Sequence, residues 1–271
     1  MGSVMHFQRT LNLLSRGSAP GYLAVFIGGF GDVVAGCLSR VEKRFPGFLP
    51  GVAHATAYYH WDGGGCGVFL DRCGKIAAEL EELRRECPGL PIVLIGHSYG
   101  GSCAVEVARR QSVQAAPLCL LTIDAVARRQ KNARPACVEW WGNAYLRDGG
   151  GFMDVVPRIG GRWGHCAGAD ANLAFSGYRR DREGRLYSHR RPAPMLYEAP
   201  AEETCSLFQA ASAWLEGRLP GCPPRGGERY RSSSSHFTSW ERSWLMRRSV
   251  CFRASSSGTL ILSPYAVEIW K

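Results

Sequence analysis

The sequence predicts an α/β protein with a mostly parallel sheet covered by helices on both faces. Short apolar segments alternate with helical patterns between residues 22 and 129, and this alternation favours parallel strands joined by helices. Several of the apolar segments end in glycine, serine or aspartate. Ligands of such proteins bind beyond the carboxyl ends of the strands. The first observation therefore predicts the architecture, and the second predicts where a functional site should lie.

The first half of the chain supplies three predicted strands and the helices between them. Residues 22–27 and 53–61 are apolar runs followed by glycine-rich loops, and residues 92–95 form an apolar, β-branched run. Helical patterns follow the first two strands, over residues 33–44 and 69–87. The second of these is clearly amphipathic.

The second half continues the pattern less regularly. Three further strands are predicted, over residues 117–123, 137–146 and 171–175. Residues 148–170 are rich in glycine and lack periodicity, so a long loop region is expected there. A closing helix is predicted over residues 194–219, with an interruption near Pro200.

Composition divides the chain into a compact domain over residues 1–221 and a basic Arg/Ser-rich tail, partly disordered, over residues 222–271. The formal net charge is +10, and the tail carries 7 Arg and 1 Lys against 3 Glu. A second basic run spans residues 179–191. Both runs fit either a solvated surface or attraction to an anionic membrane surface or acidic substrate. No nucleic-acid-binding module accompanies the charge, so nucleic acid is not expected as a partner.

Other patterns bear on compartment and cofactors. No run of about 18 apolar residues occurs, and residues 1–20 lack a secretory signal pattern, so a cytoplasmic protein is expected. The 11 cysteines form no Cys-x-x-Cys pair, which favours reduced, buried thiols over a disulfide framework or a zinc site. Neither a metal nor a cofactor is expected.

The strongest chemical signal is the segment Gly96-His97-Ser98-Tyr99-Gly100. It follows a buried strand and precedes a run of small residues with helical character. A strand, sharp turn and helix that present a serine form a nucleophile elbow. Side chains at Gly96 or Gly100 would collide as the strand and helix close on each other. An ordinary Gly/Ser turn would show the same five residues, but the flanking elements favour a nucleophile at Ser98.

A serine nucleophile needs a base, and the base is normally supported by a carboxylate. Asp124 ends the first strand after the elbow helix, so its side chain is expected one strand away from Ser98. A helix-capping or turn aspartate is the alternative role for Asp124. Asp154 and Asp170, on the later loop, are weaker candidates for the acid.

Two downstream histidines are candidates for the base. His189 follows the last predicted strand and precedes the closing helix, which suits a base that reaches back over the sheet. His165 lies earlier in the long loop and is the less favoured alternative. His97 neighbours the serine in the turn, where adjacent side chains diverge. It is therefore expected to line the substrate site, as are Trp163 and His165.

Acyl transfer also needs donors for the developing oxyanion. The backbone N–H of Tyr99, at the start of the elbow helix, is one candidate. The second is expected from the loop after the first strand, at Gly29 or Phe30, because glycine lets the main chain approach a substrate closely. A tight strand-to-helix turn would also explain these glycines.

These motifs resemble those of serine hydrolases of the α/β-hydrolase superfamily. The resemblance covers residues 22–219 and is carried by four features: Val25-Phe26-Ile27-Gly28-Gly29-Phe30-Gly31, Gly96-His97-Ser98-Tyr99-Gly100-Gly101, Thr122-Ile123-Asp124, and a late histidine. It implies an α/β-hydrolase fold without a large cap domain. It also implies a lipase- or esterase-like activity on carboxylic esters, through a Ser98–His189–Asp124 triad and an acyl-enzyme.

The resemblance leaves the substrate open. The Gly-His-Ser-Tyr-Gly-Gly form is shared by lipases, esterases and thioesterases, so a thioesterase or an acyltransferase would use the same triad. A lipid or other carboxylic ester is expected, because aromatic residues near the motifs suggest an apolar acyl pocket. A non-catalytic protein that keeps the fold and binds an anionic partner or membrane surface is the alternative of a different class. The chain is also similar to compact bacterial lipase effectors that type VI secretion exports without a signal peptide.

Overall fold

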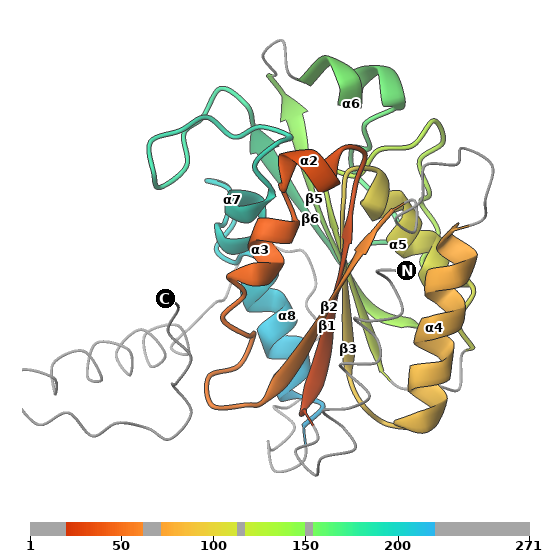
Figure 1. Ribbon diagram of the computed structural model, residues 1–271. Coiled ribbons are helices and arrows are strands. Elements are labelled where there is room, and N and C mark those ends of the chain that lie inside the picture. The colour runs from red at the N-terminus through yellow and green to blue at the C-terminus, as the bar shows by residue number, and fades with distance from the viewer. Residues whose placement is uncertain (1–19, 62–71, 113–116, 150–153, 220–271) are drawn as a thin grey trace, which may run out of the picture. The chain divides into compact units, whose positions relative to one another are not determined.

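The computed structural model describes residues 20–61, 72–112, 117–149 and 154–219, which contain a six-stranded sheet whose strands all run parallel (Figure 1). The strands are β1 (Tyr22–Gly28), β2 (His54–His60), β3 (Ile92–His97), β4 (Leu118–Ile123), β5 (Val138–Asp148) and β6 (Ala171–Ser176). Their order across the sheet is β2-β1-β3-β4-β5-β6. The predicted α/β class is confirmed, and each predicted strand corresponds to an observed one.

Helices cover both faces of the sheet. The helices are α2 (Asp32–Ala35), α3 (Ser39–Lys43), α4 (Arg72–Glu86), α5 (Tyr99–Arg109), α6 (Val155–Gly160), α7 (Pro192–Tyr197) and α8 (Leu207–Glu216). Helices α4 and α5 pack together over one face, and α3, α7 and α8 lie over the other (Figure 1). In the described part of the chain, no helix has the length and apolarity that crossing a membrane would require.

The alternation of side chains along each strand divides the core into two layers. In β1, one set of side chains packs toward α4 and α5: Leu23, Val25 and Ile27. The intervening set packs toward α3, α7 and α8: Tyr22, Ala24 and Phe26. Because successive strand residues point to opposite faces, a strand between two helical layers must be apolar throughout. All residues of β1, β3 and β4 are buried accordingly.

Three segments refine the predictions for helices and loops. The helix expected over residues 33–44 is two short helices, because Gly36 has a φ of 60° and ends α2. The loop expected over residues 148–170 contains α6, which ends where Gly161 takes a φ of 86°. The closing helix is interrupted as predicted, between α7 and α8. The expected tail, residues 222–271, lies outside the described residues.

The strand order creates a crevice at the carboxyl edge of the sheet. From β1 the chain passes to β2 on one side and then returns to β3 on the other side. Loops after neighbouring strands therefore diverge between β1 and β3, which is where ligands bind in open parallel sheets. The loop after β1 starts beside the loop after β3: a Cβ added to Gly29 would lie 2.5 Å from the Cβ of Ser98.

The tightest helix–strand contact of this region is at Gly100. A Cβ added there would overlap the carbonyl oxygen of Ile27 and lie 2.7 Å from its carbonyl carbon. We expect Gly100→Ala to lower the free energy of unfolding by about 3 kcal/mol, because a backbone group must shift to make room. Urea denaturation measures the difference. Gly164→Ala is the matched control, since a Cβ there meets nothing within 4 Å; an equal loss in both variants would contradict the packing explanation.

Candidate active site

Ser98 occupies the turn between β3 and α5 in a backbone conformation that is rare for a residue other than glycine. Its φ is 59° and its ψ is −132°, a combination that costs about 1–3 kcal/mol and is found mainly at functional sites. Hydrogen bonds hold the turn: Ser98 N donates to the Ile123 carbonyl at 3.1 Å, and Val126 N donates to the Ser98 carbonyl at 3.0 Å. A Cβ on Gly96 would overlap the Gly100 carbonyl. The two glycines are thus required by close packing, as the sequence predicted.

Ser98, His189 and Asp124 form a continuous chain of hydrogen bonds. His189 Nε2 lies 2.8 Å from Ser98 Oγ, and His189 Nδ1 lies 2.6 Å from Asp124 Oδ2. The imidazole is 12% exposed and the carboxylate is fully buried. Asp124 also has a positive φ of 41°. The structure therefore brings together the three residues expected for nucleophile, base and acid.

A second carboxylate and a guanidinium adjoin this chain. Arg162 Nε lies 3.2 Å from Asp124 Oδ2, and Arg162 Nη2 lies 3.5 Å from Asp154 Oδ1. Asp154 Oδ1 also accepts a hydrogen bond from the backbone N–H of His189 at 3.2 Å. The Asp154 side chain is 2% exposed and that of Arg162 is 12% exposed. The imidazole therefore lies in a buried cluster with two negative charges and one positive charge.

The side chain of His97 forms a hydrogen bond with the backbone of His189. Its Nε2 lies 2.7 Å from the His189 carbonyl oxygen. A carbonyl only accepts, so His97 Nε2 carries the proton. Burial lowers the pKa of His97 to about 4, and the adjacent His189 acts in the same direction. His97 is thus neutral at neutral pH and fixes the position of His189.

The loop after β1 is anchored over the site by Asp32. Its carboxylate accepts hydrogen bonds from the N–H groups of Leu38 and Ser39, at 2.9 and 3.2 Å, and from the Tyr58 hydroxyl. Burial and the Asp32 carboxylate raise the pKa of Tyr58. The anchored segment, residues 29–36, is thereby fixed beside Ser98.

The three residues expected to form an oxyanion hole lie around Ser98. Tyr99 is the first residue of α5, where N–H groups have no partner within the helix. The Gly29 carbonyl accepts from Asp32 N at 3.2 Å. In a trans peptide the N–H of Phe30 points the opposite way, away from that turn. Both loops can therefore present N–H groups at the crevice.

A cavity of about 240 Å³ opens beside the serine. Its lining includes Ser98, His97 and His189, together with the three oxyanion candidates and the residues Gly31, Asp32, Ala35, Cys37, Pro157 and Arg190. Trp163 and His165 do not line it, contrary to expectation. Trp163 is buried in the core cluster that includes residues of α4 and α5, and His165 is exposed on the loop after α6.

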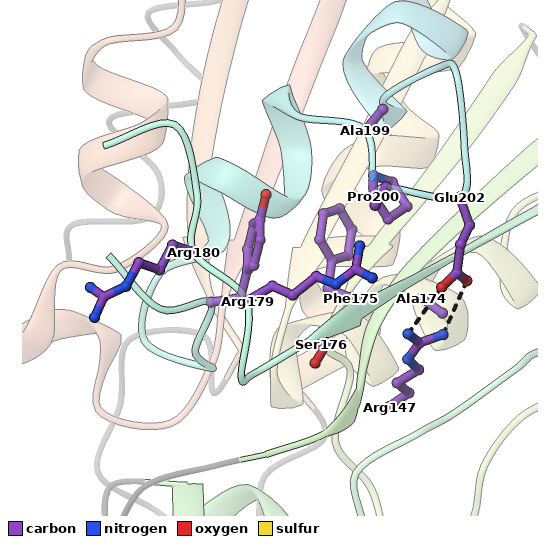
Figure 2. Close-up of a pocket in the computed structure, with 11 residues that line it drawn as sticks. Arg147, Ala174, Phe175, Ser176, Arg179, Arg180, Ala199, Pro200 and Glu202 are labelled. Carbon is purple, nitrogen blue, oxygen red and sulfur yellow. Dashed lines mark hydrogen bonds and ion pairs between the residues drawn. The ribbon is translucent and has the colours of Figure 1, made fainter. Parts of the chain in front are cut away.

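A second cavity, of about 260 Å³, lies at the end of β6 and shares no lining residue with the first. Figure 2 shows Phe175 and Pro200 in its wall, beside Arg147 and Glu202, which are joined by two hydrogen bonds of 3.0 Å. No histidine lines it. Part of the basic run 179–191 thus lies here rather than at the serine.

Sequence reasoning missed two contributors to the site. No sequence pattern indicates a role for Arg162, and the sequence predicts Asp154 only as a weaker candidate for the acid. Both flank α6, the helix that the sequence did not predict, and both contact residues that are far away in the chain. The one available signal was the position of charged residues within a glycine-rich segment that follows a strand.

His97 makes the stability of the protein depend on pH. Its folded-state pKa, about 4, lies below the ordinary value of 6.5, so the unfolded chain binds a proton first as the pH falls. The contribution is complete above pH 6.5 and is lost toward pH 4. We expect unfolding free energies of the wild type to fall more steeply across this interval than those of His97→Gln. The difference in slope should be about 1 kcal/mol per pH unit; equal slopes in urea denaturation would contradict this assignment.

A comparison with models of known protein families finds no match, and a search of curated proteins finds no relative. The chemistry of the site must therefore be inferred from its own geometry: a strained serine, a histidine that joins it to a buried carboxylate, and a cavity that reaches both the serine and the histidine.

Proposed function

We propose that this protein is a serine hydrolase of carboxylic esters, with the α/β-hydrolase fold. The observation that carries the proposal is the position of His189, whose two ring nitrogens lie 2.8 Å from Ser98 Oγ and 2.6 Å from Asp124 Oδ2. The parallel sheet with its crevice between β1 and β3, and the order Ser98, Asp124, His189 along the chain, support the same conclusion.

In the proposed reaction Ser98 Oγ attacks the acyl carbon of the ester. His189 Nε2 takes the hydroxyl proton and then gives it to the departing alcohol. The N–H of Tyr99 and that of Gly29 or Phe30 stabilise the oxyanion of the tetrahedral intermediate. Water, activated by the same histidine, then hydrolyses the acyl-enzyme and regenerates Ser98.

Asp124 orients the ring, and Asp154 and Arg162 act through it as positioning residues. Asp124 fixes the proton on Nδ1 and leaves Nε2 free to accept. Asp154 holds the His189 backbone N–H, and Arg162 pairs with both carboxylates. The excess of one negative charge favours the imidazolium that forms during the reaction.

The cavity sets the choice of test substrates. A space of about 240 Å³ is smaller than the 300–1,000 Å³ typical of pockets for drug-sized ligands. Short acyl chains are therefore the appropriate probes. A thioester, or an acceptor other than water, would engage the same three side chains.

Ser98→Ala should lower kcat/KM for para-nitrophenyl butyrate by at least about 10³-fold, because no other group supplies the nucleophile. It should also abolish labelling by a fluorophosphonate probe. Ser102→Ala is the matched control: Ser102 lies one turn later in α5, where its hydroxyl bonds the Tyr99 carbonyl. Retained turnover in Ser98→Ala would exclude the mechanism. Absence of labelling in folded wild-type protein would favour a non-catalytic binding role.

Removing the charge of Asp154 and removing that of Arg162 should shift the pH dependence of kcat/KM in opposite directions. Asp154→Asn removes a negative charge and disfavours the imidazolium, so the acid limb of kcat/KM should shift to lower pH by about one unit. Arg162→Met should shift it to higher pH by a similar amount. The double variant should return near the wild-type profile. His97 stays neutral above about pH 4 and does not obscure the comparison. Shifts of the same sign in both single variants would indicate a merely structural role.

A further inference from the structure

We propose that the cavity beside Ser98 selects esters that carry an anionic group, a carboxylate or a phosphate, and that Arg190 and Arg40 recognise this group. This inference rests on the proposed function and adds the chemical class of its substrate.

Arg190 is an exposed cation in the wall of the cavity. It follows His189 directly, and it lines the same space as Ser98 and Cys37. In the part of the chain that the structure describes, no carboxylate lies within 4.0 Å of its guanidinium. Its side chain contacts the Cys37 thiol, which is not a carboxylate, so no ion pair within the described residues neutralises the charge of Arg190.

Arg40 is a second cation that lies next to the cavity without lining it. Its guanidinium donates a hydrogen bond of 2.6 Å to the carbonyl of Ala35, a residue that lines the cavity. Burial and, after it, the Asp32 carboxylate raise the pKa of the Cys37 thiol, while Arg190 and Arg40 act on it in the opposite direction. The thiol is therefore neutral. Arg190 lines the same cavity as Cys37, and the guanidinium carbon of Arg40 would lie 3.7 Å from a Cβ added to the neighbouring Gly36. Arg40, like Arg190, forms no ion pair within the described residues.

The carboxylates near the cavity are already engaged. Asp32 lines it, but its oxygens accept two backbone N–H groups and the Tyr58 hydroxyl. Asp124 lies at the Nδ1 side of His189, away from Ser98, where Arg162 pairs with it. Asp32 keeps its negative charge, because its hydrogen-bond donors are neutral, but Arg190 and Arg40 outnumber it beside the cavity. Guanidinium groups bind carboxylate and phosphate strongly.

Matched pairs of esters test the inference on the intact protein. The first pair is mono-para-nitrophenyl adipate and its methyl ester, which place the charge on the acyl side. The second is para-acetoxybenzoate and its methyl ester, which place it on the alcohol side. The third is dihexanoyl phosphatidylglycerol and the uncharged dihexanoylglycerol, which tests a lipid headgroup as the source of the anion. We expect kcat/KM to favour the anionic member of at least one pair by about 10-fold at low salt.

The ratio within a pair is the readout, because it does not depend on the fraction of folded protein. Arg190→Met should reduce the ratio to near one, Arg40→Met should reduce it partly, and Arg190→Lys should retain most of it. Arg85→Met is the matched control, since Arg85 is exposed on α4 and does not line the cavity.

The outcomes separate this inference from the proposed function. Equal turnover of both members in all three pairs, or a ratio that Arg190→Met leaves unchanged, overturns the anionic specificity and leaves the hydrolase intact. No turnover of any ester, together with no fluorophosphonate labelling, overturns both.

Discussion

The structure of the site depends on holding one imidazole between two strands. Ser98 and Asp124 come from the ends of β3 and β4, which are hydrogen-bonded neighbours in the sheet, so their separation is fixed. His189 comes from the connection between β6 and α7, which belongs to no strand or helix. Its ring is held by Ser98 and Asp124, its N–H by Asp154, and its carbonyl by His97. These four contacts fix the position of His189, although it lies in a loop, as the sheet fixes the positions of Ser98 and Asp124.

The connection itself is braced at its start and its end. Asp181 accepts from the N–H groups of Glu183 and Arg185, at 3.0 and 2.9 Å, and pairs with Arg191. The Tyr187 hydroxyl donates to Glu198 at 2.7 Å. Part of the basic run 179–191 is thus engaged in contacts within its own loop and does not form a continuous charged surface. Arg190 takes part in neither of these pairs and lines the cavity instead.

The sequence predicts those features that depend on interactions between residues close together in the chain or in the sheet. The strands, the turn at Ser98 and the position of Asp124 depend on neighbours along the chain or in the sheet, and these were predicted. The prediction of one continuous helix over residues 33–44 was wrong. The helix is divided because Gly36 adopts a positive φ, which composition does not reveal. The segment that contains α6 was expected to be loop because its short helix is bounded by Asp154 and Gly161 and has little periodicity. The pairing of Arg162 with Asp124 could not be predicted, since no local pattern links a guanidinium to a carboxylate across the sheet edge.

The buried charges around His189 support the proposed hydrolase function, because they do not favour stability. Two carboxylates and a guanidinium lie almost out of contact with water, and an apolar cluster of similar volume is often as stable or more stable than a buried ion pair. Ser98 and Asp124 add backbone strain at φ values of 59° and 41°. Both costs fall on the same few residues, next to the imidazole and the cavity. Such costs are expected where a neutral ring must become transiently charged, because preorganised charges then need no reorganisation during the reaction. The coincidence of these buried charges with the strained residues therefore supports the proposed reaction at Ser98 and His189.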